Sequence, residues 1–224
     1  MKAIILFSGG VDSTVMLAQA LHNGRKCMAL SFDYGQRNRV ELNSAKKIAA
    51  YYQISHRVIT LNNSTFNQSG LIDENTLLPS NRTFDQIASS GIPITYVPAR
   101  NTLFIAYAMG LAEITSADEI YMGANATDLN SYPDCRPVFF SAFQSLIDVA
   151  TKQATEGTAP RIVTPLIHLD KKAIISEGLR LGAPLDETFS CYAPLESGLA
   201  CGNCDACMLR NAGFKAAREH FENK

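Results

Sequence analysis

Residues 8–14, with the sequence Ser-Gly-Gly-Val-Asp-Ser-Thr, have the residue types of an anion-binding loop. They follow the apolar run 3–7, which has the composition of a buried strand, and they open an expected helix. Glycine lets the backbone approach a phosphate closely, and a helix N-terminus presents free N–H groups and a positive dipole end. The stretch lacks the ending of a Walker loop and the spaced glycines of a dinucleotide fingerprint. We therefore expect a phosphate-binding loop, with an ordinary glycine-rich turn as the alternative.

Four cysteines near the C-terminus have the spacing of a metal site. Cys191, Cys201, Cys204 and Cys207 form the pattern C-x9-C-x2-C-x2-C. Four thiolates suit tetrahedral zinc, although the same donors also hold iron–sulfur clusters, and free or redox-active cysteines are the third alternative. Zinc with four thiolates has no open position, so it would not activate water. We expect one structural zinc ion per subunit that holds the C-terminal segment beside the active site.

The composition excludes several classes of protein. The chain has 224 residues, of which 46% are hydrophobic and 18% charged, as in a globular protein with a sizeable core. A net charge of −1 gives no general attraction to nucleic acid. No apolar run approaches the roughly 20 residues that span a bilayer, and the N-terminal run is too short for a signal peptide. We expect a cytoplasmic protein without membrane or nucleic-acid partners, whose cysteines are reduced unless they bind metal.

Strands and helices alternate along the chain, which is typical of a parallel sheet with helices on both faces. We therefore expect an α/β, Rossmann-like fold with a five-stranded parallel sheet. The expected strands are 3–7, 27–32, 57–61, 119–123 and 161–164. The expected helices are 12–23, 40–52, 101–114, 138–154 and 171–181, followed by a short C-terminal helix. Asp12 or Ser13 is expected to cap the first helix, and Asp170 the helix that follows it.

Two further features concern the organisation of the chain. Residues 62–96 are polar and too long for a plain connection, which is typical of a lid or binding loop. Ligands of open α/β sheets bind at the carboxyl ends of the strands, so the loops there should supply further functional residues. We expect a nucleotide-binding domain over 1–186 and a small zinc-binding segment with a packed helix over 187–224.

Five motifs occur in order along nearly the whole chain. They are residues 7–14, the run 33–37 with Glu41-Leu42, Val-Pro-Ala-Arg-Asn at 97–101, Tyr-Pro-Asp-Cys-Arg at 132–136, and the cysteines with Leu209-Arg210. Together they resemble the 7-cyano-7-deazaguanine synthase family of the pyrophosphate-loop ATPase superfamily. The resemblance implies an adenine nucleotide alpha hydrolase-like fold, a homodimer and a role in queuosine precursor biosynthesis.

The resemblance also implies a reaction. An ATP-dependent ligase of this family converts 7-carboxy-7-deazaguanine and ammonia to the 7-cyano base. The carboxylate is adenylated, ammonia displaces AMP to give an amide, and the adenylated amide loses AMP to leave the nitrile. Positioning and charge stabilisation dominate such chemistry, and Mg²⁺ that accompanies ATP is expected to neutralise the departing pyrophosphate.

The family motifs assign catalytic roles to four residues. Asp12 belongs to the pyrophosphate loop, although it also suits a helix cap. Arg100 opens a helix, a position that suits a phosphate or the substrate carboxylate. Asp134 can accept the two N–H donors of a guanine-like edge and Arg136 can pair with a carboxylate or phosphate, with a structural ion pair as the alternative. The expected nucleotide-binding residues are Phe7, Ser8, Gly9, Gly10, Val11, Asp12, Ser13, Thr14, Val15, Met16 and Leu17.

The roles of several other polar residues stay open at this point. Tyr34 and Gln36 follow the second strand and are expected to face the nucleotide or the base. Arg37 either joins them or is a solvated loop charge. Asn101 shares the helix start with Arg100. Lys171 either reaches a phosphate or lies in solvent.

One loop departs from the family pattern. The family usually carries an aromatic-Ser-Gly run before Tyr132, whereas this chain has Leu-Asn-Ser at 129–131, and Val138 stands where an acidic residue is common. The missing glycine changes the backbone freedom of a loop expected to contact the base. An enzyme that stops at the amide is therefore an alternative. A related ligase acting on tRNA and a non-catalytic zinc module are further alternatives, although the chain has no added basic domain and keeps the intact loop.

Overall fold

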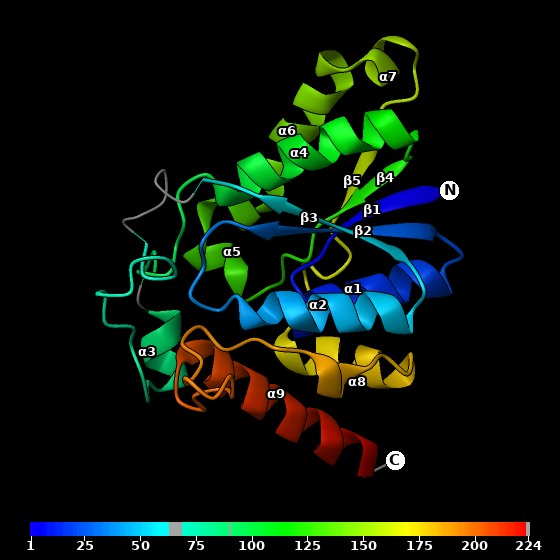
Figure 1. Cartoon of the computed structure of the whole chain (residues 1–224). Coiled ribbons are helices and arrows are strands. Elements are labelled where there is room, and N and C mark those ends of the chain that lie inside the picture. Colours follow the sequence, from blue (N-terminus) through cyan, green and yellow to red (C-terminus); the bar gives the residue numbers. More distant parts are fainter. Residues whose placement is uncertain (63–68, 90, 223–224) are drawn as a thin grey trace.

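Figure 1 shows the computed structural model of the chain, which describes residues 1–62, 69–89 and 91–222. All neighbouring strands of its sheet run parallel, in the order β3-β2-β1-β4-β5. The expected five-stranded parallel sheet is confirmed, with small shifts at the strand ends. The strands are β1 (Lys2–Leu6), β2 (Lys26–Asp33), β3 (Ser55–Thr60), β4 (Glu119–Tyr121) and β5 (Arg161–Val163).

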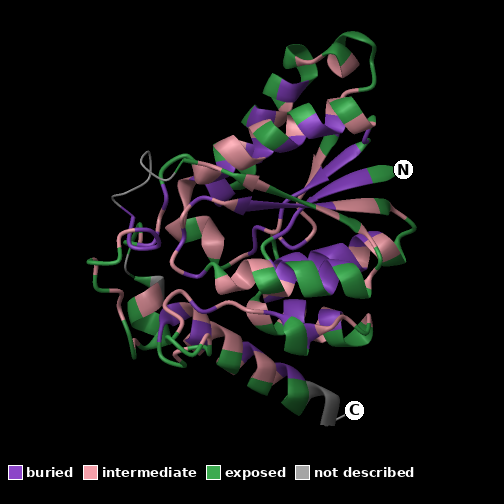
Figure 2. Cartoon of the chain, in the orientation of Figure 1, coloured by how far each residue is buried: buried purple, intermediate pink, exposed green. Residues whose placement is uncertain are grey.

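Helices cover both faces of this sheet (Figure 1). Side chains of β1 alternate between the two faces, so Ala3 and Ile5 join one core cluster and Ile4 and Leu6 join the other. Figure 2 shows β1 buried along most of its length, which explains its continuous apolar sequence. One face carries α1 (Val11–His22), α2 (Val40–Tyr51) and α8 (Lys171–Arg180), and the other carries α4 (Arg100–Thr115) and α6 (Pro137–Ala150).

The helix caps agree with the sequence in one case and not in the other. Asp170 caps α8 as expected, because its Oδ1 accepts from the N–H of Ala173 at 2.8 Å. The expected cap of α1 by Asp12 or Ser13 is wrong. That helix begins at Val11 with Gly10 as its N-cap, which places both side chains inside the first turn.

Two further expectations about helices are corrected. The helix expected over 138–154 is divided into α6 and α7 (Lys152–Thr155), because Thr151 has extended backbone and its side chain caps α7. The C-terminal helix α9 (Asp205–Glu222) is 18 residues long rather than short. Within the described residues, no helix is both long and apolar enough to cross a membrane. Unforeseen elements are α3 (Phe84–Ala88), α5 (Asp128–Ser131) and the 3-10 turns Pro133–Cys135 and Leu185–Glu187.

The described part of the long connection lies against the cysteine-bearing segment. Ser80 forms an antiparallel β-bridge with Cys204, and the N–H of Asn81 donates to the Asn203 carbonyl at 2.8 Å. Arg82 forms an ion pair with Asp205 at the start of α9. Residues 63–68 and 90 of the expected lid lie outside the described residues, so the lid itself stays a prediction.

The C-terminal helix α9 packs closely against the start of α8. A Cβ atom at Gly213 would lie 2.6 Å from Cγ of Lys171 and 2.8 Å from Cδ1 of Ile175. The aliphatic stem of Lys171 therefore lies directly against the backbone of α9. Since Lys171 is the first residue of α8, this contact fixes where its ammonium group is presented.

We predict that Gly213→Ala lowers the free energy of unfolding by about 1–3 kcal/mol, because the added methyl group must separate the two helices or displace Lys171. Gly110→Ala in the middle of α4 is the matched control, since no described atom would lie within 4 Å of its Cβ. That change should raise stability by about 0.5–1 kcal/mol through helix propensity. Urea denaturation measures the free energy of unfolding of both variants. An equal change in Gly213→Ala and Gly110→Ala would contradict the close contact of α8 with α9.

Candidate active site

The turn from β1 into α1 is held between two other parts of the chain. Gly9 has a φ of +83°, and a Cβ there would lie 2.5 Å from the backbone N of Ala45 and O of Glu41 in α2. On the other side, the N–H of Phe189 donates to the Gly9 carbonyl at 3.0 Å. The left-handed backbone and the absence of space both require glycine at this position. The loop is thereby fixed against α2 and against the segment that leads to the cysteines.

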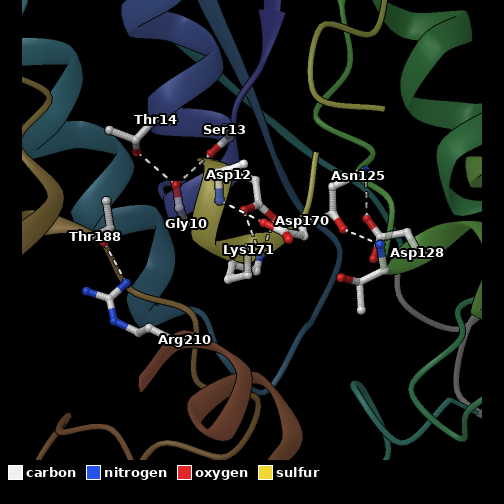
Figure 3. Close-up of polar contacts among 12 residues, drawn as sticks. Gly10, Asp12, Ser13, Thr14, Asn125, Asp128, Asp170, Lys171, Thr188 and Arg210 are labelled. Atoms are coloured by element: carbon white, nitrogen blue, oxygen red, sulfur yellow. Dashed lines mark hydrogen bonds and ion pairs between the residues drawn. The ribbon is translucent and has the colours of Figure 1, made fainter. Parts of the chain in front are cut away.

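Hydroxyl groups hold the remaining backbone of the loop (Figure 3). Ser13 Oγ and Thr14 Oγ1 donate to the Gly10 carbonyl at 3.1 and 2.8 Å, and Ser8 Oγ accepts from the N–H of Gly10 at 3.2 Å. Gly10 offers no side-chain acceptor to the first turn of α1. The positive end of α1 therefore faces the adjoining cavity, which is an anion-binding arrangement.

Lys171 and Asn125 meet Asp12 beside this loop (Figure 3). The Nζ of Lys171 lies 2.6 and 2.8 Å from the two carboxylate oxygens of Asp12, and Asn125 Nδ2 donates to Oδ2 at 3.0 Å. The Lys171 side chain is 20% exposed. Lys171 therefore does not lie in solvent but contacts the loop at Asp12, and its contact with a phosphate stays a prediction.

Asp128, at the start of α5, adds a second carboxyl group on this side of the cavity. Its Oδ2 accepts from the backbone N–H of Asn125 at 3.2 Å. Burial, and then the negative charge of Asp12, raises the pKa of Asp128 to about 6, while Lys171 acts in the opposite direction. Two carboxyl groups and one ammonium group therefore share this end of the site.

The loop opens into a cavity of about 300 Å³ at the carboxyl edge of the sheet. Phe32, Tyr34 and Phe104 form an aromatic wall of this cavity. The rings of Phe32 and Phe104 are stacked, with centroids 4.0 Å apart and planes at 4°. The guanidinium carbon of Arg100 lies 5.8 Å from the centroid of Phe104. A flat aromatic ligand would find both stacking surface and positive charge here.

Glu41 brings a partly buried carboxyl group to the same cavity. Its Oε1 accepts from Gln36 Nε2 at 3.3 Å, and its Oε2 accepts from Asn38 Nδ2 at 2.8 Å. Burial raises the pKa of Glu41 to about 7, although the hydrogen bond from Gln36 and the charge of Arg100 lower it. Glu41 is therefore a carboxyl group whose charge responds to pH near neutrality.

Among the residues expected to be catalytic, Arg100 lines the cavity with its neighbour Asn101. Asp134 is buried beneath them: its Oδ2 accepts from the N–H of Asn101 at 3.1 Å, and Asn101 Nδ2 donates to its carbonyl oxygen at 3.1 Å. Arg136 is exposed and donates to the Leu129 carbonyl at 3.1 Å. Neither Asp134 nor Arg136 is among the described cavity-lining residues, and they form no ion pair within the described chain.

Two other arginines differ in their positions. Arg37 donates to the Thr76 carbonyl at 2.9 Å and thereby holds the long connection in place. It is not among the described residues that line the cavity. Arg210 lines the cavity and donates to Thr188 Oγ1 at 2.6 Å (Figure 3), and its guanidinium lies 4.8 Å from the ring centroid of Phe214. Burial lowers the pKa of Arg210.

The four cysteines of the C-terminal segment come together as expected. Their sulfur atoms all lie within 4.8 Å of one another, so the cluster could hold a metal ion. Cys135 lies apart from this cluster, against Asn101. Burial raises the pKa of Cys135 to about 12, which keeps its thiol protonated and unsuited to nucleophilic attack.

Comparison with known proteins identifies the family of the chain. Residues 2–218 match the family model described as queuosine biosynthesis protein QueC. The protein belongs to the QueC family. A curated relative from Coxiella burnetii, named 7-cyano-7-deazaguanine synthase, is 49% identical over 96% of this chain and 94% of its own length. A relative of the same name from Alcanivorax borkumensis is 46% identical over 96% of this chain and 95% of its own length.

The similarity of this QueC family member to one solved structure of another protein is weaker. NMN synthetase from Francisella tularensis is similar over 100% of this chain and 86% of its own, with 17% identity and a TM-score of 0.49.

The sequence of this QueC family member pointed to some cavity residues and missed others. Of the expected nucleotide-binding residues, Phe7, Ser8 and Gly10–Ser13 line the cavity, whereas Val15–Leu17 are fully buried in the core. Glu41 and Arg210 had been quoted only as parts of motifs, with no role assigned. Asp128 was missed, although it follows β4 and so belongs to the kind of loop expected to supply functional residues.

We predict that Gly9→Ala strongly impairs nucleotide binding and lowers the free energy of unfolding. Gly24→Ala is the matched control, because Gly24 also has a positive φ of +73° but no described atom within 4 Å of an added Cβ. Backbone strain alone should lower the free energy of unfolding of the control by about 1–2 kcal/mol. In Gly9→Ala the collision of the added methyl group with α2 should lower it by about 1–3 kcal/mol more. Thermal unfolding with and without ATP measures both effects; normal ATP stabilisation of Gly9→Ala would contradict this account of the loop.

Proposed function

We propose that this protein is an ATP-dependent 7-cyano-7-deazaguanine synthase, which makes a queuosine precursor from 7-carboxy-7-deazaguanine, ammonia and ATP. The main support is the 49% and 46% identity to relatives of that name over 96% of the chain. The cavity adds physical support, because it joins an anion-binding loop to an aromatic wall. A nucleoside triphosphate and a flat heterocyclic base have matching chemistry.

In the first half of the reaction, the loop and α1 bind the phosphates that leave as pyrophosphate. An oxygen of the substrate carboxylate attacks the α-phosphorus, and the bond from that phosphorus to the pyrophosphate oxygen breaks. The negative charge that develops on pyrophosphate is stabilised by the N-terminus of α1 and by Lys171, which exchanges Asp12 for a phosphate oxygen. Arg100 holds the substrate carboxylate beside the α-phosphate.

In the second half, nitrogen replaces oxygen. The lone pair of ammonia attacks the acyl carbon, the bond to AMP breaks and one proton is released, which gives the amide. The amide oxygen then attacks the α-phosphorus of a second ATP, again with loss of pyrophosphate. Departure of AMP and loss of two protons from nitrogen leave the nitrile. The same loop therefore serves both adenylations.

Magnesium is expected to enter with ATP, and the cavity offers suitable donors. Asp12 and Asp128 both present carboxylate oxygens beside the loop, which are the ligands that Mg²⁺ prefers. When bound, the ion supplies positive charge against the phosphates.

We assign the cysteines to one structural zinc ion in a segment, 187–224, that packs on a nucleotide-binding domain, 1–186. Sulfur atoms within 4.8 Å of one another suit tetrahedral zinc, whose thiolates lie about 3.8 Å apart for Zn–S bonds of about 2.3 Å. An iron–sulfur cluster places several atoms between the thiolates and needs a wider arrangement. Contacts of the segment with Gly9 and with Lys171 support its role in positioning the site.

The chemistry also bears on location and assembly. Reduced thiolates and a supply of ATP are properties of the cytoplasm, where we place the protein. We further propose that it acts as a homodimer on small molecules, without a nucleic-acid partner, in keeping with its net charge of −1.

The proposed function predicts the products of the purified protein. With 7-carboxy-7-deazaguanine, ATP, magnesium and ammonium, mass spectrometry should detect the nitrile together with AMP and pyrophosphate. Lys171→Gln should lower kcat/KM for ATP by about 10- to 100-fold, since one charged contact to phosphate is lost. The neighbouring Lys172→Gln is the control, because Lys172 is exposed and is not among the described cavity residues.

Three outcomes would revise this function. An amide as the final product would keep the adenylation chemistry and change the enzyme's name. ADP in place of AMP would contradict adenylation. No conversion by a folded, metal-loaded protein would overturn the substrate assignment.

The zinc assignment predicts that Cys204→Ser lowers both metal content and thermal stability, because one of four ligands is lost. Elemental analysis of the unaltered protein should give about one zinc and no iron per chain. Cys27→Ser is the matched control, since Cys27 lies in β2 and outside the cluster, and its metal content should not change. Stoichiometric iron with acid-labile sulfide would contradict the assignment.

A further inference from the structure

Three carboxyl groups of the described chain line the cavity: Asp12, Glu41 and Asp128. Asp12 is bonded to Lys171 at the phosphate end, and Asp128 lies beside that pair. Glu41 differs from both, because its carboxylate is held by the neutral amides of Gln36 and Asn38, away from the Asp12–Lys171 pair. Its carboxyl group is therefore available to a part of the ligand other than the phosphates.

Neutral amides hold the two oxygens of Glu41 in a fixed orientation. Gln36 donates to Oε1, and its own position is set by the backbone, because its Oε1 accepts from Tyr34 N–H at 2.9 Å and its Nε2 donates to the Phe32 carbonyl at 3.0 Å. Asn38 donates to Oε2 at 2.8 Å. Each carboxylate oxygen thus has one hydrogen bond from the protein and retains acceptor capacity.

Two adjacent acceptors with fixed orientation match a ligand edge that carries two parallel N–H donors. A guanine-like base presents such an edge through its ring N1–H and its exocyclic amine. The corresponding edge of adenine has one donor and one acceptor, so its ring nitrogen would face a carboxylate oxygen without a proton between them. The geometry of Glu41 therefore favours the guanine-like substrate over the adenine of ATP.

We propose that Glu41 is a specificity-determining residue that accepts hydrogen bonds from the N1–H and exocyclic amine of the deazaguanine, whose ring lies against the wall formed by Phe32 and Phe104. This inference rests on the proposed function. It gives Glu41 the role that the sequence suggested for Asp134. The carboxylate of Asp134 already accepts from the N–H of Asn101, and Asp134 is not among the described cavity-lining residues.

The proposal has a pH dependence of definite sign. Protonation removes an acceptor from Glu41, and burial raises its pKa to about 7, so substrate affinity should fall as the pH decreases through about 7. The groups facing Glu41 are Arg100, which stays charged, and Tyr34, whose pKa burial raises. Neither of these two groups titrates in this range. Burial raises the pKa of Asp128 to about 6, so Asp128 could also contribute to a pH dependence. The variant Glu41→Gln, described next, distinguishes its contribution from that of Glu41.

The test is calorimetric binding of 7-carboxy-7-deazaguanine, and of its analogue without the exocyclic amine, to the unaltered protein and to Glu41→Gln. A glutamine amide can accept from Gln36 and donate to Asn38, whose Oδ1 is buried without a partner in the described structure and can turn toward it. The variant should therefore fold, which ATP binding verifies. Glu156→Gln, at the exposed C-cap that follows α7, is the control for loss of a carboxylate outside the cavity.

We expect Glu41→Gln to weaken substrate binding by about 10- to 100-fold, with little change in the Kd for ATP. The unaltered protein should prefer the full substrate over the analogue by a similar factor, and the variant should lose this preference and the pH dependence near 7. Equal substrate affinity in variant and unaltered protein, or a change confined to ATP, would overturn the role of Glu41 while leaving the proposed function intact. If the unaltered protein binds and converts no 7-carboxy-7-deazaguanine, both proposals fail together.

Discussion

The position of Gly9 is the constraint on which the site depends. Its backbone touches the backbone of α2 so closely that no side chain fits, and its carbonyl accepts from Phe189 on the opposite side. The helix α2 that closes the loop also carries Glu41, and the segment beyond Phe189 carries the cysteines and Arg210. One turn therefore brings three distant parts of the sequence to the same cavity, and a shift of this turn would move all of them.

The two ends of the cavity differ in their chemistry. At one end, the backbone amides of the first turn of α1 and the ammonium group of Lys171 provide positive potential, and Asp12 forms an ion pair with Lys171. At the other end, stacked aromatic rings and a carboxyl group held by neutral amides suit a flat base with N–H donors. Arg100 stands beside the aromatic wall. This division would orient the two substrates relative to each other, which is the main requirement of adenylation chemistry.

The sequence predicted those parts of the structure that depend on neighbouring residues. The parallel sheet, the glycine-containing turn from β1 into α1 and the cysteine cluster follow from local apolar runs, adjacent glycines and short cysteine spacing. The helix cap at Gly10 was missed because the hydroxyl of Ser13 bonds to a carbonyl oxygen rather than to the first turn. The surroundings of Glu41, Asp128 and Asp134 depend on contacts across the fold. The family motif and the acceptor chemistry of a carboxylate suggested a ligand role for Asp134, whereas its oxygen accepts from the start of α4.

The measurement that tests this account most directly is a crystal structure with 7-carboxy-7-deazaguanine and an ATP analogue that has a methylene bridge between the α- and β-phosphorus atoms. The account predicts phosphates on the first turn of α1 and on Lys171, and the two N–H donors of the base within about 2.7–3.2 Å of the Glu41 oxygens. Phosphates bound away from the loop at Gly9, or a base whose N–H edge faces any other residue, would contradict it.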